Sequence, residues 1–404
     1  MATSSHSIEN PRKHSSPPGY APFALGFRPF FLAAGLFAVL LMVGWLLVLF
    51  GGLNLGPLSP RVWHGHEMLF GFTVAVIAGF LLTAAQNWTG IPTASGAPLA
   101  ALFLLWLAGR VSFLVPGLPV GLVALIDLSF LPVLALALTV PLLKAKQLHN
   151  YPFPVMLLAL AGANALVHLD TLGWTDDWSR SSASLGLHLG TYVIVTMMVV
   201  MGGRVIPNFT NNKLGTRARR WKIIEILAPA ATIGALLSAL ISPVSLVTAG
   251  LAAIAAVVHA IRLAGWHTVK YWSVPLLWIL HLGYAWIALG FGLLALSAAG
   301  MSAAAVSALH AFTTGGIGML TLGMMARVSL GHTGRALEPA SLMTRAFVVI
   351  NIAALLRVAL PLLFPGVYVQ SMTAAGLAWV AAFGLFVVVY TPMLLRPRVD
   401  HKPG

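Results

Sequence analysis

Long apolar runs, separated by short polar or charged turns, follow one another along almost the whole chain. A helix needs about 20 apolar residues to cross a lipid bilayer, so these runs predict twelve membrane-spanning helices. Their approximate bounds are 29–50, 66–86, 98–115, 120–143, 152–172, 184–206, 223–241, 243–262, 273–297, 304–328, 342–363 and 367–394. The runs are continuous rather than alternating, which excludes a transmembrane β-barrel. The pattern therefore predicts an all-α polytopic membrane protein.

The domain organisation follows from the same pattern, because no gap between the apolar runs is long enough for a water-soluble domain. We expect a single twelve-helix domain over residues 21–395. Residues 1–20 are polar and lack the apolar core and cleavage site of a signal peptide, so they are expected to form a disordered cytoplasmic tail. Residues 396–404 form a second short tail. The weakest predicted boundary is Ser242-Pro243, between the seventh and eighth spans.

The composition agrees with a chain that lipid surrounds. Hydrophobic residues make up 59% of the sequence and charged residues only 8%, whereas soluble domains carry roughly 25% charged residues. Mean hydropathy is +0.92. The sequence has no cysteine, which excludes disulfides, thiolate metal sites, Fe–S clusters and the CxxCH attachment of covalent haem.

The positive charges predict how the chain is oriented. With the N-terminus inside, nineteen of the 23 Lys and Arg residues fall on the inner side, and only Arg61, Arg110, Arg180 and Arg357 fall outside. This asymmetry favours a cytoplasmic position for both termini. The net charge of +14 is thus a topology signal in short loops, and it does not indicate a nucleic-acid partner.

A regular spacing of histidines suggests an internal repeat. His66, His188 and His310 lie near the start of the second, sixth and tenth spans, and each is 122 residues from the next. We therefore expect three units of four spans, roughly 21–143, 144–265 and 266–395. Coincidence within a low-complexity apolar chain is the alternative interpretation.

The repeat predicts a site near the outer membrane face. If the second helix of each unit faces the middle, His66, His188 and His310 lie at one depth, with His64 beside them in a loop. Ionisable groups in a membrane are costly and usually functional. In a chain without cysteine, converging imidazoles suit haem iron or copper. The alternative is a set of hydrogen-bonded packing residues.

Other polar residues in the spans could extend this site. His168 is near the outer end of the fifth span, and His281 lies within the ninth, where it needs a partner. Tyr192 shares a helical face with His188 because it follows four residues later. Glu67 could orient a ligand histidine, relay protons, or only favour a helix start.

Three further polar residues are expected to have local roles. Asp127 is interpreted as a helix-start residue and Glu225 as an interface residue. His259 lies near an inner helix end, where we expect it to extend toward the membrane surface. Most methionines of the sixth and tenth spans are expected to pack in the core.

Four motifs give the chain a specific resemblance. Residues 26–31 (GFRPFF), 63–71 (WHGHEMLFG), 203–212 (GRVIPNFTNN) and 326–335 (ARVSLGHTGR) resemble the NnrS family, and the resemblance runs from about residue 20 to 395. It implies a multi-pass protein of the bacterial inner membrane that contains non-covalent haem and copper. It also implies a link to nitric oxide metabolism and resistance to nitrosative stress. Nitric oxide or a related small molecule would be the ligand, and an unidentified electron donor a partner.

The architecture is similar, more distantly, to the catalytic subunit of haem-copper oxidases and nitric oxide reductases. Twelve spans with histidines on spans two, six and ten match that pattern, and His188 with Tyr192 has the His-x-x-x-Tyr spacing. The seventh span lacks the histidine pair of that superfamily, and the tenth span has only His310. The resemblance therefore implies a reduced set of one haem and one other metal.

Two other functions stay open from the sequence. A transporter without haem would use Arg204 and Arg327 as substrate contacts and a Gly-rich segment as its moving element. A threefold repeat is unlike the paired repeats of transporters. A non-catalytic partner of another membrane enzyme is the remaining alternative.

Overall fold

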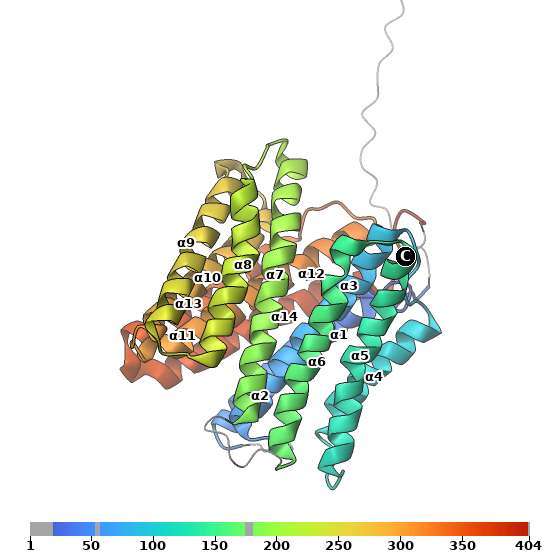
Figure 1. Ribbon diagram of the computed structural model, residues 1–404. Coiled ribbons are helices and arrows are strands. Elements are labelled where there is room, and N and C mark those ends of the chain that lie inside the picture. The colour runs from blue at the N-terminus through green and yellow to red at the C-terminus, as the bar shows by residue number, and fades with distance from the viewer. Residues whose placement is uncertain (1–18, 53–56, 174–180, 403–404) are drawn as a thin grey trace, which may run out of the picture.

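The computed structural model (Figure 1) describes residues 19–52, 57–173 and 181–402. Within these residues the chain forms fourteen α-helices, two π-helical segments and three short 3-10 segments, and no strand. All twelve predicted spans are present as helices. Eleven are long and apolar enough to cross a membrane, and the third, Ala97–Ser112, is shorter at 16 residues. The chain is thus an all-α protein with the helix content of a multi-pass membrane protein.

Helices of the first four spans are separated by turns that contain glycine or proline. Their bounds are α1 Phe27–Leu49, α2 Pro60–His66, η1 Glu67–Thr73, α3 Val74–Thr89, α4 Ala97–Ser112 and α5 Val120–Lys144. The segments α2, η1 and α3 form one continuous helix over Pro60–Thr89. Pro60 begins this helix, where a missing N–H costs nothing, and Gly90 ends it in the left-handed conformation.

The middle four spans follow the short 3-10 segment η2 Leu148–Asn150. Their bounds are α6 Pro152–Thr171, α7 Ser182–Leu214, α8 Lys222–Ile241 and α9 Leu246–Trp266. The weakest predicted boundary is confirmed as a break, because α8 ends at Ile241 and α9 begins at Leu246. The Ser245 hydroxyl caps α9 by accepting a hydrogen bond from the Thr248 N–H at 3.1 Å.

The last four spans follow the 3-10 segment η3 Val269–Ser273. Their bounds are α10 Pro275–Ala298, α11 Ala303–His310, η4 Ala311–Ile317, α12 Gly318–His332, α13 Ser341–Leu363, η5 Pro365–Val367 and α14 Tyr368–Leu395. The segments α11, η4 and α12 form one continuous helix over Ala303–His332.

Successive helices pack side by side, and α14 packs against α1, so the bundle closes on itself. Figure 1 shows α5 to α9 in front, with the first and last helices behind them. Three helices, α3 with η1, α7, and α12 with η4, contact one another. These are the second helices of the three predicted units.

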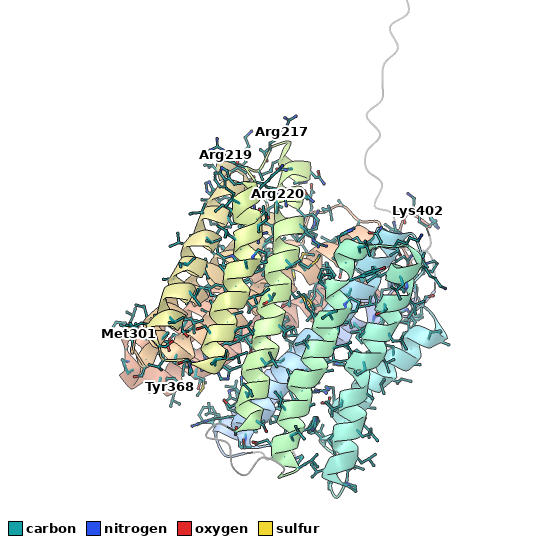
Figure 2. The ribbon with its side chains drawn as sticks, viewed as in Figure 1. Arg217, Arg219, Arg220, Met301, Tyr368 and Lys402 are labelled. Carbon is teal, nitrogen blue, oxygen red and sulfur yellow. The ribbon has the colours of Figure 1, made fainter. Side chains whose placement is uncertain are left out.

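The bundle has two chemically different ends. Arg217, Arg219, Arg220 and Lys402 lie toward one end, which we call the basic end (Figure 2). The opposite end, where α1 finishes and α2, α7 and α11 begin, we call the histidine end. Between the ends, many large apolar side chains are exposed, including Leu40, Leu136 and Ile254. Such a surface suits contact with lipid.

The two π-helical segments occupy matching positions. Segment η1 begins directly after His66 and η4 directly after His310, and each is seven residues long. Their starts are 311 − 67 = 244 residues apart, which is twice the 122-residue spacing of the histidines. Helix α7 is α-helical throughout. Segments of π-helix are rare in proteins, and those that occur are often at functional sites. The matching π-helical segments therefore mark His66 and His310 as candidate functional residues.

The predicted N-terminal tail lies almost entirely outside the described residues. The C-terminal segment packs against the end of α12. Val399 is 6% exposed and donates its N–H to the Thr333 carbonyl at 3.1 Å. Arg398 donates to the His332 carbonyl at 3.0 Å. This part of the predicted second tail is therefore ordered against the bundle.

Candidate functional site

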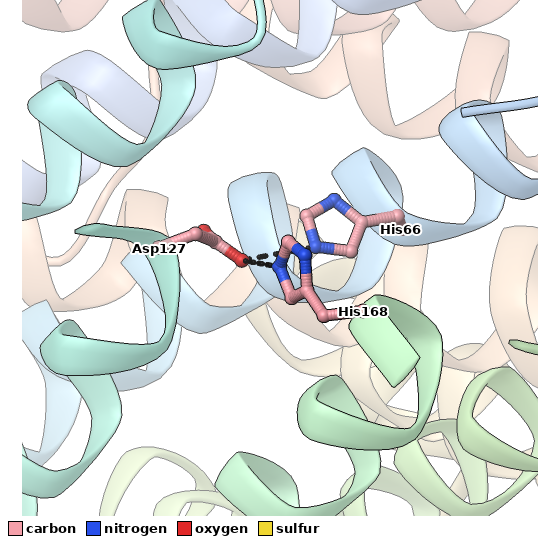
Figure 3. A group of neighbouring side chains, drawn as sticks. All are labelled: His66, Asp127 and His168. Carbon is pink, nitrogen blue, oxygen red and sulfur yellow. Dashed lines mark hydrogen bonds and ion pairs between the residues drawn. The ribbon is translucent and has the colours of Figure 1, made fainter. Parts of the chain in front are cut away.

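Six polar side chains meet inside the bundle, near the histidine end. We call them the buried polar cluster: His66, Glu67, Arg110, Asp127, Asn164 and His168. They come from α2, η1, α4, α5 and α6, and each is 7% exposed or less. Figure 3 shows His66, from α2, and His168, from α6, facing the carboxylate of Asp127.

Asp127 is the centre of the cluster. Its Oδ2 lies 3.1 Å from Nε2 of His66 and 2.9 Å from Nε2 of His168. The same oxygen accepts a hydrogen bond from Nδ2 of Asn164 at 2.7 Å. The other oxygen, Oδ1, forms an ion pair with Arg110. Asp127 thus joins residues of three other helices.

His66 lies between two carboxylates. Its Nδ1 is 3.0 Å from Oε1 of Glu67, and its Nε2 faces both Asp127 and Oδ1 of Asn164, the latter at 2.9 Å. Since all these neighbours are acceptors, both ring nitrogens can donate only when the ring carries its second proton. A metal ion bound at Nε2 would take the place of that proton.

The cluster pairs groups of opposite charge. Arg110 donates to Oε2 of Glu67 at 2.8 Å and also pairs with Asp127. Two carboxylates thus face one guanidinium and two imidazoles, which is the pairing that buried charges require. A second proton on His66 would make the net charge of the cluster zero when His168 is neutral.

Two glycines make room for these charged side chains. A Cβ on Gly71 would lie 2.7 Å from Oε2 of Glu67 and 2.5 Å from the Phe37 ring. A Cβ on Gly109 would lie 3.0 Å from Oδ1 of Asp127. The close approach of α4 to η1 and α5 therefore depends on positions without a side chain.

The cluster has the donor atoms of a metal site. Ligand atoms of His66, Asp127 and His168 all lie within 4.8 Å of one another. Two imidazoles and a carboxylate suit copper, zinc or non-haem iron. Glu67, on the other ring nitrogen of His66, is the kind of carboxylate that orients a ligand histidine.

A second group of predicted residues lies elsewhere at the histidine end. The His64 ring stacks on Trp45, with ring centroids 4.4 Å apart, and its buried Nδ1 has no hydrogen-bond partner among the described residues. Nδ1 of His310 lies 2.8 Å from the Val306 carbonyl. Both imidazoles interact electrostatically with Arg357, and with each other. We call His64 and His310 the histidine pair.

His188 and Tyr192 lie in a third place. They line a cavity of about 200 Å³ between α7, α8, α10 and α11, together with Ser184, Leu240 and Phe312. Nδ1 of His188 donates to the Ser184 carbonyl at 2.8 Å, and the rings of His188 and Tyr192 are 6.0 Å apart. No described contact joins His188 to His66 or to His310.

His281 lies apart from the other predicted ligands. It stacks on Tyr271 with centroids 4.1 Å apart and hydrogen-bonds the Leu277 carbonyl through Nδ1 at 2.9 Å. The structure therefore brings His66, Glu67 and His168 together, pairs His64 with His310, and separates His188 and His281 from both groups.

The sequence analysis assigned a different role to two residues of the cluster and did not identify a third. Asp127 does not start a helix, since α5 begins at Val120 and Asp127 lies two turns inside it. It is the one acidic residue in the apolar run 120–143, which was a usable signal. Arg110 was placed only among the outer-side charges, whereas it is 7% exposed within α4 and pairs with the cluster carboxylates. Asn164, missed entirely, lies one turn before His168 on α6.

A separate buried network lies nearer the basic end. Arg262 hydrogen-bonds the Val199 carbonyl and Tyr284, each at 2.9 Å, and forms an ion pair with Glu225. His259 lies between Tyr284 and Thr232, at 2.8 and 2.9 Å. The expectation that His259 extends toward the membrane surface was wrong, because the residue is fully buried.

Comparison with known proteins places the chain in a family. No curated protein matches it at a significant level. The family model described as NnrS protein matches residues 21–398, which is nearly the whole chain and includes both histidine groups. The chain therefore belongs to the NnrS family.

Proposed function

We propose that this protein binds haem and copper and acts in nitric oxide metabolism or in resistance to nitrosative stress. Its family supports a membrane protein related to nitric oxide. The observation that carries the haem assignment is the buried Nδ1 of His64 in the histidine pair, which has no hydrogen-bond partner among the described residues. The copper assignment is supported by the two imidazoles and the carboxylate that converge in the buried polar cluster.

The histidine pair suits haem iron because both rings retain a nitrogen for a ligand. A carbonyl can only accept, so Nδ1 of His310 carries the hydrogen bonded to Val306 and Nε2 keeps its lone pair. Nδ1 of His64 has no partner among the described residues. Imidazole is a common axial ligand of haem, and the bound iron supplies reversible binding of nitric oxide.

The chain's own residues would fix the orientation of these ligands. Trp45 holds the His64 ring by stacking at an interplanar angle of 19°. The Val306 carbonyl fixes the tautomer of His310. The π-helical segments η1 and η4 begin next to the two positions, at Glu67 and Ala311.

Copper suits the buried polar cluster better than the histidine pair. The carboxylates of Asp127 and Glu67 compensate the charge of a bound cation, whereas the histidine pair faces the guanidinium of Arg357. His66, His168 and Asp127 would hold the ion. Glu67 would hold the Nδ1 proton of His66.

The proposal also states in which membrane the protein lies and how the chain is oriented there. We infer a bacterial inner membrane, cytoplasmic termini, and three four-span units. Arg217, Arg219 and Arg220 at the basic end support a cytoplasmic position for that end. The 244-residue offset of η1 and η4 supports the repeat. Both metal sites would then lie toward the outer face.

A transporter has less support. Arg204 donates to Oδ1 of Asn150 at 2.7 Å and to the His149 carbonyl at 3.0 Å. The Arg327 guanidinium lies 3.6 Å from the centre of the Phe209 ring. Both arginines that would contact a transported substrate are thus engaged within the protein.

The test is an optical spectrum of the detergent-purified protein, oxidised and reduced, with metal analysis of the same sample. We expect a histidine-ligated haem spectrum that His64→Ala and His310→Ala each abolish. His168→Ala should lose copper and keep the haem bands. His149→Ala, on an exposed loop residue, is the matched control and should keep both.

Two results would contradict the proposal. The first is a wild-type protein that stays colourless and metal-free after reconstitution with haem and copper. The second is full retention of haem and copper by all three variants. Folding of each variant is checked by its elution from size exclusion and by its helical circular dichroism.

A further inference from the structure

Arg357 is a buried arginine without an acidic partner among the described residues. It lies on α13 at the histidine end and is 9% exposed. Its Nη2 is 3.4 Å from the Tyr368 hydroxyl, and its buried Nη1 has no hydrogen-bond partner in the described part of the chain. The guanidinium therefore has unused donor capacity inside the protein.

Other buried arginines are satisfied differently. Arg110 pairs with Glu67 and Asp127, and Arg262 pairs with Glu225. Arg28 donates to three backbone carbonyls near the C-terminus of α14. A buried guanidinium is favourable only when such acceptors surround it. Arg357, with one long contact to a phenol, is the exception.

The residues around Arg357 do not supply the missing negative charge. Ser307 on α11 donates to the Val358 carbonyl at 3.0 Å, which holds α11 beside Arg357. His310 follows Ser307 by one helical turn, and Arg357 interacts electrostatically with this residue and with His64. The guanidinium of Arg357 repels a bare cation and attracts an anion.

We propose that Arg357 binds a carboxylate or a small oxyanion at the histidine end, next to the histidine pair. A guanidinium donates two parallel hydrogen bonds to a group with two oxygens. Two sources offer this chemistry. One is a propionate of the haem, and in this form the inference rests on the proposed function. The other is free nitrite, the oxyanion formed when nitric oxide is oxidised.

The experiment uses full-length protein purified without haem. It is titrated separately with haem, with haem dimethyl ester, in which both propionates are blocked, and with sodium nitrite. Charge-assisted hydrogen bonds change affinity by about tenfold to a hundredfold. If a propionate is the ligand, wild-type protein should bind haem more tightly than the ester by this factor, and Arg357→Gln should bind both equally.

The nitrite arm separates the second source. If free nitrite is the ligand, calorimetry should detect binding to wild-type protein and none to Arg357→Gln. Arg357→Lys, which keeps the positive charge, should retain part of the effect in either arm. Arg345→Gln, an exposed position on the same helix, is the matched control and should behave as wild type.

One pattern overturns the inference. If Arg357→Gln changes neither the preference for haem over its ester nor nitrite binding, Arg357 does not bind an anion. The haem assignment would survive that result as long as His310→Ala still abolishes the haem spectrum. Conversely, Arg357-dependent nitrite binding by a protein that never binds haem would support this inference and reject the haem assignment.

Discussion

The phenol oxygen of Tyr284 lies 2.8 Å from Nδ1 of His259 in the interior of the bundle. Arg262 donates to the same oxygen at 2.9 Å, so the phenol hydrogen points to the imidazole. Nε2 of His259 then donates to Thr232, which donates to the Ala228 carbonyl at 2.8 Å. The chain of hydrogen bonds is directional and satisfies the phenol, the imidazole and the threonine hydroxyl. It links α8, α9 and α10.

Replacement of Tyr284 by phenylalanine should destabilise the protein without a change in shape. It leaves His259 Nδ1 buried without a donor and removes one acceptor from Arg262. Loss of one partner in a buried polar pair costs about 1–3 kcal/mol. The measurement is thermal unfolding in detergent. Tyr20→Phe, at a side chain that is 84% exposed, should leave the midpoint unchanged, and equal midpoints for both variants would refute the buried role of the phenol.

A methyl group at Gly203 should disrupt the same network. A Cβ there would overlap the guanidinium of Arg262, which crosses this glycine to reach the Val199 carbonyl. Overpacking of this kind costs about 1–3 kcal/mol. Gly203→Ala should therefore lower the unfolding temperature.

The matched control for Gly203 is Gly234, in the middle of α8, where nothing lies within 4 Å of an added Cβ. Gly234→Ala should be neutral or stabilising by up to about 1 kcal/mol, because alanine favours helix. Similar loss of stability in both variants would mean that helix packing in general, rather than the position of Arg262, explains the effect.

Asp127→Asn should damage both metal binding and stability. The neutral side chain cannot balance Arg110 and His66, and a broken buried ion pair costs about 3–5 kcal/mol. We expect loss of copper by elemental analysis and a lower unfolding temperature. Asp170→Asn, at a half-buried carboxylate that forms no ion pair among the described residues, should change neither. A variant that is stable and keeps its copper would show that Asp127 is not central to the cluster.

The number and approximate positions of the helices were predictable because each span needs about 20 apolar residues. Their lengths were not, since they range from 16 residues in α4 to 33 in α7. The break at Ser242-Pro243 was also predictable, since proline and serine favour a helix boundary. Pairing between helices was not predictable in the same way. A lone carboxylate in the run 120–143 indicates that Asp127 faces away from lipid, but nothing local indicates that its partners lie on α2 and α6.

The partners of single site residues were not predictable from the sequence either. His64 and His66 are two positions apart, so they face different sides of the helix. His66 faces Asp127, and His64 stacks on Trp45. Spacing identified both residues as candidates, but only the packing of α1 and α5 on either side assigns them to different groups.

The C-terminal segment should loosen in acid. Arg398 donates to both carboxylate oxygens of Asp400, at 2.8 and 2.6 Å, and this holds the pKa of Asp400 well below its usual range. A carboxylate whose pKa is lowered by folding stabilises the folded segment at pH values above its unfolded pKa, which is about 4. This stabilisation decreases as the pH falls below the unfolded pKa and toward the lower folded pKa.

The measurement is hydrogen exchange at the Val399 amide, corrected for the intrinsic exchange rate. Protection of this amide should fall as the pH decreases below about 5. Asp400→Asn should lower protection at neutral pH and remove this pH dependence, whereas Asp170→Asn should keep the wild-type profile. An identical profile for wild type and Asp400→Asn would show that the ion pair does not hold the segment.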